Sequence, residues 1–181
     1  MDLIQGIRER RSIRKFEDKP VSRELIKEIV ETASYAPSWK NTQTWRYIVV
    51  DNKEILKRIS SEECMMGFAH NGEIVAKTPA LVVLTSVKGR SGYERDGSFS
   101  TAKGSHWESF DAGAAAQTFC LAAHEKGLGT VIMGIFDESK IGGVIPIPEE
   151  QQIAALIALG YPAEVPKAPA RKAAEELLTF I

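Results

Sequence analysis

The sequence contains little cysteine and no long apolar run. Two cysteines, Cys64 and Cys120, occur in 181 residues, which excludes a fold built on a disulfide framework. Neither belongs to a Cys-x-x-Cys pair, so we expect two buried free thiols in a reducing, cytoplasmic environment. Apolar runs such as 80–84 and 153–159 are too short to cross a bilayer, and the first residues lack the pattern of a secretory signal. We therefore expect a cytoplasmic protein with no membrane partner.

An excess of either charge is also absent. The chain has 23 basic and 24 acidic residues, a formal net charge of −1, which excludes a protein that is basic throughout and coats nucleic acid. Apolar residues make up 44% and charged residues 26%, as in ordinary globular domains. No internal repeat or low-complexity linker divides the chain. The length and composition predict a single domain over 1–181.

Hydrophobic periodicity predicts a mixture of helices and strands. Helical spacing occurs over 3–9, between Ser22 and Pro37, over 53–59 and over 107–126, whereas apolar runs typical of strands occupy 45–50, 80–84, 130–133 and 153–159. This pattern favours an α+β or mixed α/β fold with a central sheet of about four or five strands. The 107–126 helix is apolar nearly all round, so we expect it to be buried in the core or against a partner subunit.

Five cations lie close together near the N-terminus: Arg8, Arg10, Arg11, Arg14 and Lys15. Guanidinium groups match the geometry of phosphate oxygens, and the hydroxyl of Ser12 would add a donor. This cluster favours an anion site, most simply for a phosphate. A solvated helix end is an equal alternative, because cations are favourable at a helix C-terminus. A nucleic-acid surface is a third reading, although no aromatic residues alternate with the arginines.

Other polar segments carry weaker signals. The loop 37–43 holds Ser38, Asn41 and Gln43, uncharged side chains that suit a planar heterocycle, although on spacing alone ordinary turn chemistry explains them better. Glycines between 88 and 105 predict a mobile loop or lid. The turn 127–129 follows a helix and precedes a strand, the reverse of a dinucleotide-binding turn. The histidines are scattered and indicate no metal site. Asp111 reads as an acid in the first turn of the long helix rather than a catalytic base.

Taken in order, several segments resemble the nitroreductase family of flavoproteins. The matching segments are Arg10-Arg11-Ser12-Ile13-Arg14-Lys15-Phe16, the loop from Ala36 to Trp45, Asp111 to Gln117, Gly127 to Gly134, and Gly160-Tyr161-Pro162 to Arg171. The resemblance covers essentially the whole chain. It implies a three-layer α+β fold with a central, mainly antiparallel sheet, and a homodimer that holds one FMN at each of two sites along the subunit interface.

The resemblance also implies roles for individual residues. Arg10 and Ser12 would lie at the phosphate and ribityl end of FMN, Arg14 at the pyrimidine edge of the ring, and the C-terminal Arg171 at the phosphate. The partner subunit would contribute its 37–43 loop, and a backbone N–H from 132–135 would face N5. The full set of expected FMN contacts is Arg10, Arg11, Ser12, Arg14, Pro37, Ser38, Trp39, Asn41, Gln43, Asn71, Ile132, Met133, Gly134, Ile135 and Arg171. The tail, residues 162–181, would embrace the partner.

The activity implied by the resemblance is that of an oxidoreductase in which the flavin carries the chemistry. It would take hydride from NAD(P)H, a transient co-substrate, and reduce a nitroaromatic, quinone or similar acceptor by a ping-pong mechanism. Arg14 would stabilise the negative charge of the reduced ring. Two alternatives stay open: an FMN enzyme with other chemistry (reductive dehalogenation, enoyl-type reduction or oxygen-dependent consumption of the flavin), and a non-enzymatic module that binds phosphate or nucleic acid.

Overall fold

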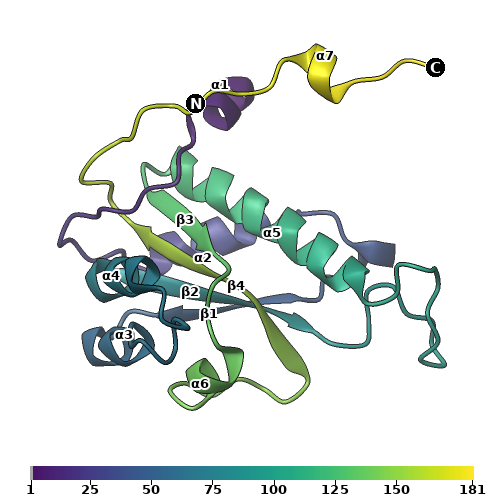
Figure 1. Ribbon diagram of the computed structural model, residues 1–181, viewed down its shortest axis with the longest axis horizontal. Coiled ribbons are helices and arrows are strands. Elements are labelled where there is room, and N and C mark those ends of the chain that lie inside the picture. The colour runs from purple at the N-terminus through teal and green to yellow at the C-terminus, as the bar shows by residue number, and fades with distance from the viewer. Residues whose placement is uncertain (1) are drawn as a thin grey trace.

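The computed structural model describes residues 2–181 and is built around one antiparallel sheet (Figure 1). Its four strands are β1 (Trp45–Val50), β2 (Ala80–Val87), β3 (Gly129–Met133) and β4 (Gln151–Gly160), in the order β1-β2-β4-β3. Every neighbouring pair is antiparallel. The predicted α+β fold with a central antiparallel sheet is therefore confirmed, and all four predicted strands are present.

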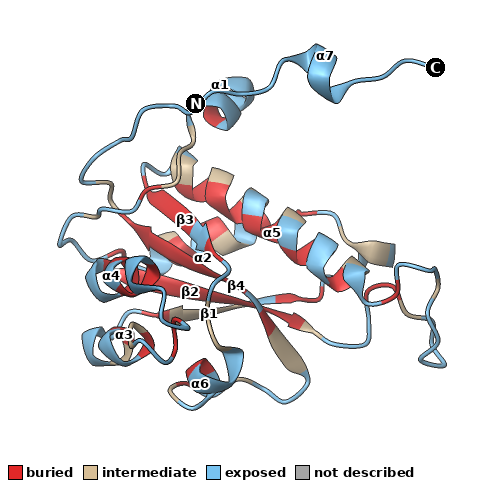
Figure 2. Ribbon diagram, in the orientation of Figure 1, coloured by how far each residue is buried: buried red, intermediate tan, exposed pale blue. Residues whose placement is uncertain are grey.

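Helices cover both faces of the sheet. One face carries α2 (Arg23–Ala33) and α5 (His106–Glu125), and the other carries α3 (Lys53–Ile59), α4 (Ala69–Lys77) and α6 (Glu138–Gly142). The central strands are buried on both sides, as Figure 2 shows. Along β2, Val82 and Leu84 join the core under α2 and α5, whereas Leu81 and Val83 join the core under α3 and α4. Burial on both faces explains why these strands are continuously apolar.

The ends of the chain lie outside this body. The first helix, α1 (Leu3–Glu9), exposes Leu3, Ile4 and Ile7, and the tail beyond residue 162 runs away from the sheet to a short helix, α7 (Ala174–Leu177) (Figure 1). Most of the large apolar side chains at the end of the tail, including Leu177 and Phe180, are exposed. One copy of the chain therefore leaves apolar surface uncovered at both termini.

The segment that follows α1 runs along the edge of the sheet. The backbone N–H of Ile13 donates to Thr130 O of β3 at 2.9 Å, and Glu17 N–H donates to Tyr161 O at 2.9 Å. Gly129 makes this approach feasible, because a Cβ at that position would lie 2.5 Å from Ile13 Cγ1. The side chain of Ile13, which is buried, anchors the arginine-rich segment on both sides of it to β3.

Some local features differ from expectation. The helices α4, α6 and α7 and the 3-10 turn η1 (Trp39–Asn41) were not predicted. Strand β2 continues past Leu84 to Val87 and stays paired with β4, and the buried hydroxyl of Thr85 donates to Gln151 Oε1 of β4 at 2.5 Å. Cys64 and Cys120 are buried free thiols, as expected. Within residues 2–181 no helix is long and apolar enough to cross a membrane, and no group of three acidic, histidine or cysteine side chains could hold a metal ion.

Candidate functional site

Basic side chains from both ends of the chain line one cavity. It has a volume of about 300 Å³, and Arg10, Arg11, Ser12 and Arg14 face Lys167 and Arg171 of the tail across it, with Pro166 and Pro169 completing the wall. The structure thus brings together the predicted N-terminal residues and the predicted C-terminal arginine, which are separated by about 160 positions in the sequence. Lys167 was missed; its signal is a cation among the prolines of the tail.

The guanidinium groups in this cavity differ in how they are bonded. Arg11 donates through Nη1 to the carbonyl oxygens of Arg8 and Arg10, at 2.5 and 2.8 Å, and Arg14 donates to Ser12 O at 3.3 Å. By contrast, among residues 2–181 the side chains of Arg10 and Arg171 form no hydrogen bond or ion pair. These two cations retain all their donors for an anion, whereas Arg11 also braces the backbone.

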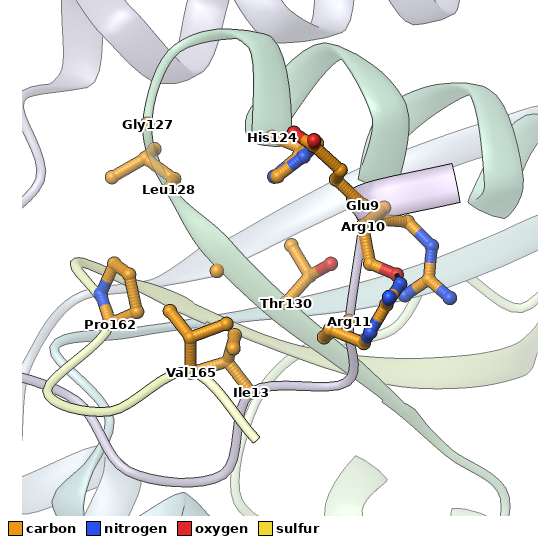
Figure 3. Close-up of a pocket in the computed structure, with 11 residues that line it drawn as sticks. Glu9, Arg10, Arg11, Ile13, His124, Gly127, Leu128, Thr130, Pro162 and Val165 are labelled. Carbon is orange, nitrogen blue, oxygen red and sulfur yellow. Dashed lines mark hydrogen bonds between the residues drawn. The ribbon is translucent and has the colours of Figure 1, made fainter. Parts of the chain in front are cut away.

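A second cavity lies against the first, at the C-terminal end of α5. It has a volume of about 220 Å³ and places Arg10 and Arg11 opposite His124, with Thr130 of β3 as part of the wall (Figure 3). His124 Nε2 is buried, and within the described chain it has no hydrogen-bond partner. Burial, followed by the charge of Arg10, lowers the pKa of His124, so the imidazole is neutral near pH 7.

The loop 37–43 has a strained and internally bonded backbone. Lys40, Asn41 and Gln43 have φ values of 46°, 55° and 48°, in the left-handed region that side chains other than glycine seldom adopt. Ser38 Oγ accepts a hydrogen bond from Gln43 N at 3.0 Å, and Gln43 Nε2 donates to Asn41 Oδ1 at 3.2 Å. Backbone strain of this kind is concentrated at binding sites. Three of the predicted contacts, Ser38, Asn41 and Gln43, are therefore held together by one another.

A tilted aromatic contact and a buried carboxylate fix this loop to the first turns of α5. The Trp39 ring packs on Trp107 with centroids 4.7 Å apart, and Trp39 N–H donates to Asp111 Oδ2 at 2.9 Å. The expectation for Asp111 was wrong. It is the sixth residue of α5, is 1% exposed and binds other segments rather than the first-turn N–H groups. The missed signal is an acid that interrupts the apolar sequence of a buried helix.

A third group of predicted residues lies at the end of β3. Asn71 of α4 is 6% exposed, and its Nδ2 donates to Ile135 O at 3.1 Å. Met133 is buried in the core, whereas Ile132 and Ile135 are exposed, and apart from its chain neighbours no described residue has an atom within 4 Å of a Cβ built on Gly134. The backbone at Gly134 is therefore open to a planar ligand, and Asn71 holds the neighbouring carbonyl.

The two main groups of predicted residues lie at opposite ends of α5. The 37–43 loop contacts Asp111 near the N-terminal end of this helix, and the arginine segment shares a cavity with His124 near its C-terminal end. His124 lies thirteen positions after Asp111, which corresponds to about 20 Å along a helix. A single copy of the chain thus keeps the loop and the arginines apart.

Comparison with known proteins gives a family for this arrangement. The model of the nitroreductase family matches residues 7–161, which include all four strands and most of the residues described above. The chain therefore belongs to the nitroreductase family.

Individual relatives agree with this assignment. A protein of Methanothermobacter thermautotrophicus is 34% identical over 170 residues, covering 92% of this chain and 80% of the relative. The NADH dehydrogenase of Thermus thermophilus is 31% identical over 187 residues, covering 91% and 88%. Among solved structures, an FMN-dependent nitroreductase from Clostridium difficile R20291 superposes with a TM-score of 0.79 at 29% identity, with 98% of each chain covered.

Proposed function

We propose that this protein is an FMN-dependent oxidoreductase that takes hydride from NAD(P)H and reduces a nitroaromatic, a quinone or a similar electrophilic acceptor. The observation that carries the proposal is the cavity in which Arg10 and Arg171 converge from the two ends of the chain. Membership of the nitroreductase family, and the FMN-dependent and NADH-using relatives, support the choice of cofactor and electron donor.

The donors in the cavity fit the terminal phosphate of FMN. A phosphate dianion needs about two cations for neutralisation, and Arg10 and Arg171 present guanidinium groups that have no other partner among residues 2–181. The Ser12 hydroxyl adds an uncharged donor on the same wall. Arg11 also lines the cavity, and its bonds to backbone carbonyls keep the segment in shape. The charge and the donors of the site thus match this end of the cofactor.

When bound, FMN supplies an isoalloxazine ring that accepts a hydride and then gives up electrons. Arg14 would hold a positive charge near the pyrimidine edge and so favour the reduced ring. The open backbone around Gly134 would offer an N–H to the ring, and Asn71, bonded to Ile135 O, would keep that backbone in place. These residues bind and orient, and none is needed as a nucleophile. NAD(P)H and the electron acceptor can therefore bind one after the other at the same open face of the ring.

The site would be completed by a second copy of the chain. On α5, Phe110 is 64% exposed. Along the same side of the helix lie four more residues that the described chain leaves exposed or only partly buried: Gly113, Ala114, Gln117 and Leu121. Together they form a strip that faces solvent. A two-fold axis across this strip would set two α5 helices antiparallel. The N-terminal end of one helix would then lie beside the C-terminal end of the other. This arrangement brings the 37–43 loop of one subunit to the arginines of its partner.

The first test is the visible spectrum of the purified protein, followed by titration of the cofactor-free protein with FMN. We expect a yellow protein whose colour is bleached by excess NADH or NADPH without oxygen. Arg10→Ala and Arg171→Ala should each weaken FMN binding by about 10- to 100-fold, as expected when a charge-assisted contact is lost. Arg58→Ala, which removes an arginine from the last turn of α3, is the matched control and should change nothing.

Each contrary result would identify a different error. A colourless protein that does not bind added FMN would overturn the proposal, and binding of an oligonucleotide lost in Arg10→Ala would favour the nucleic-acid module. A yellow protein that neither nucleotide bleaches would exclude the proposed electron donor. Turnover of halogenated or enoyl substrates, or consumption of the flavin with oxygen, would favour the same cofactor with other chemistry.

A further inference from the structure

One buried carboxylate oxygen joins two segments that are far apart in the sequence. Asp111 Oδ2 accepts hydrogen bonds from Trp39 N at 2.9 Å and from Ser91 Oγ at 2.5 Å. Trp39 belongs to the 37–43 loop, and Ser91 belongs to the glycine-containing segment 88–105 that connects β2 to α5. Both donors are neutral, so no cation explains why a carboxylate is buried here.

The direction of the hydrogen bonds extends this link. Ser91 Oγ also lies 3.0 Å from Thr42 Oγ1 of the loop. Because Ser91 gives its proton to Asp111, Thr42 must donate to Ser91, which forms a chain from loop to segment to helix. At the surface, Lys40 adds an ion pair with Glu94 at 2.9 Å. The loop and the segment are therefore connected directly at two points, and a third connection runs through Asp111, which binds both.

We propose that Asp111 is a positioning residue that holds the 37–43 loop and the 88–105 segment as one unit, in the strained conformation needed for FMN binding. The inference rests on the proposed function, in which this loop contacts the cofactor. The left-handed backbone at Lys40, Asn41 and Gln43 persists only while its surroundings hold it, and Asp111 is the buried acceptor that fixes the preceding residue, Trp39, to α5. Without this acceptor, the loop relaxes and only a fraction of molecules can bind FMN.

The same helix provides a matched control. Glu108, one turn before Asp111, is 4% exposed and also accepts two hydrogen bonds, from Gly89 N at 2.6 Å and from Gln152 Nε2 at 2.8 Å. It ties the root of the 88–105 segment to β4 and has no bond to the 37–43 loop. Removal of either carboxylate leaves two donors without their acceptor. The two substitutions should therefore lower the free energy of unfolding by comparable amounts. Only the loss of Asp111 acts on the loop.

The experiment compares Asp111→Ala, Asp111→Asn and Glu108→Ala in the full-length chain. We expect Asp111→Ala to raise the Kd for FMN by about 10- to 100-fold, because the apparent Kd equals the intrinsic Kd divided by the fraction of competent molecules. Asn keeps an oxygen at the position of Oδ2 and should restore the Kd to within about threefold. Glu108→Ala should lower the urea midpoint without changing the Kd. In the cofactor-free protein, the exciton band of the tilted ring pair Trp39–Trp107 in circular dichroism should weaken only in Asp111→Ala.

A fourth variant tests the link between the two segments. Ser91→Ala keeps the bond from Trp39 to Asp111 but removes the bridge, so trypsin should cleave the 88–105 segment at Arg90 and Arg95 several-fold faster while the Kd for FMN stays unchanged. If Asp111→Ala binds FMN as tightly as the wild type, or if Glu108→Ala weakens binding equally, the inference is wrong.

Two further measurements keep the test decisive. If Asp111→Ala does not fold, amide hydrogen exchange of the wild type tests the inference instead. The amides of Trp39 and of the 88–105 segment must then exchange through one shared opening of the structure, and independent opening overturns the inference. If the wild type itself does not bind FMN, the proposed function fails. The circular dichroism and hydrogen-exchange results still show whether Asp111 holds the 37–43 loop and the 88–105 segment together.

Discussion

Replacement of Gly129 by alanine tests whether the arginine segment depends on its contact with β3. A Cβ at this position would lie 2.5, 2.7 and 2.9 Å from three side-chain atoms of Ile13. Ile13 is 4% exposed and sits between Ser12 and Arg14, so it cannot move without moving the residues that line the arginine cavity. Overpacking of this kind costs about 1–3 kcal/mol of the free energy of unfolding.

The assay is urea denaturation followed by circular dichroism, with FMN titration of the same samples. Gly129→Ala should lower the midpoint with little change in the slope, and it should weaken FMN binding because Ser12 and Arg14 are displaced. Gly142→Ala is the control. Apart from its chain neighbours and the backbone of its own helix, no part of residues 2–181 lies within 4 Å of a Cβ there, and this helical position in α6 should gain slightly from alanine. A Gly129→Ala protein as stable as the control, with unchanged FMN binding, would refute the reasoning.

Three further outcomes are expected. Phe110→Asp, which places a charge on the exposed strip of α5, should give a monomer in sedimentation that no longer retains FMN; a monomer that still binds FMN tightly would contradict the shared site. The lowered pKa of His124 means that protonation is less favourable in the folded state, so stability should be full above about pH 6.5 and decline as the pH falls below it. In His124→Gln, the urea midpoint should fall less than in the wild type between a pH above 6.5 and a pH below it. Burial raises the pKa of the Cys120 thiol, so a thiol reagent should modify it only after unfolding, and rapid modification of the native protein would show that the α5 core opens.

The sheet and the long helices could be predicted from the sequence because each is encoded locally. Apolar runs gave all four strands, and the N-cap at Ser22, whose Oγ accepts from Leu25 N, marked the start of α2. By contrast, α4 begins at Ala69, its N-cap residue Phe68 makes no side-chain capping bond, and Met66 and Gly67 before it both have positive φ. A helix stabilised by packing rather than by its own signals is hard to recognise in a sequence.

The candidate site was predictable only in part, for a similar reason. The arginines near position 12 formed a visible cluster, and the family resemblance added Arg171, which the structure places in the same cavity. The role of Asp111 depends on donors 72 and 20 positions away, and nothing in the local sequence of α5 indicates where these donors lie. A residue that bonds across such distances becomes visible only when the chain is folded.

The separation of the loop and the arginines along α5 has a genetic consequence. In the proposed dimer each catalytic centre draws on both subunits, so a chain defective at Arg10 and a chain defective at Asp111 would complement each other when mixed. In such a hybrid, one centre would inherit both lesions and the other neither. Two inactive parents would then yield an assembly with a single working centre, whereas lesions confined to one end of the helix would give no such rescue.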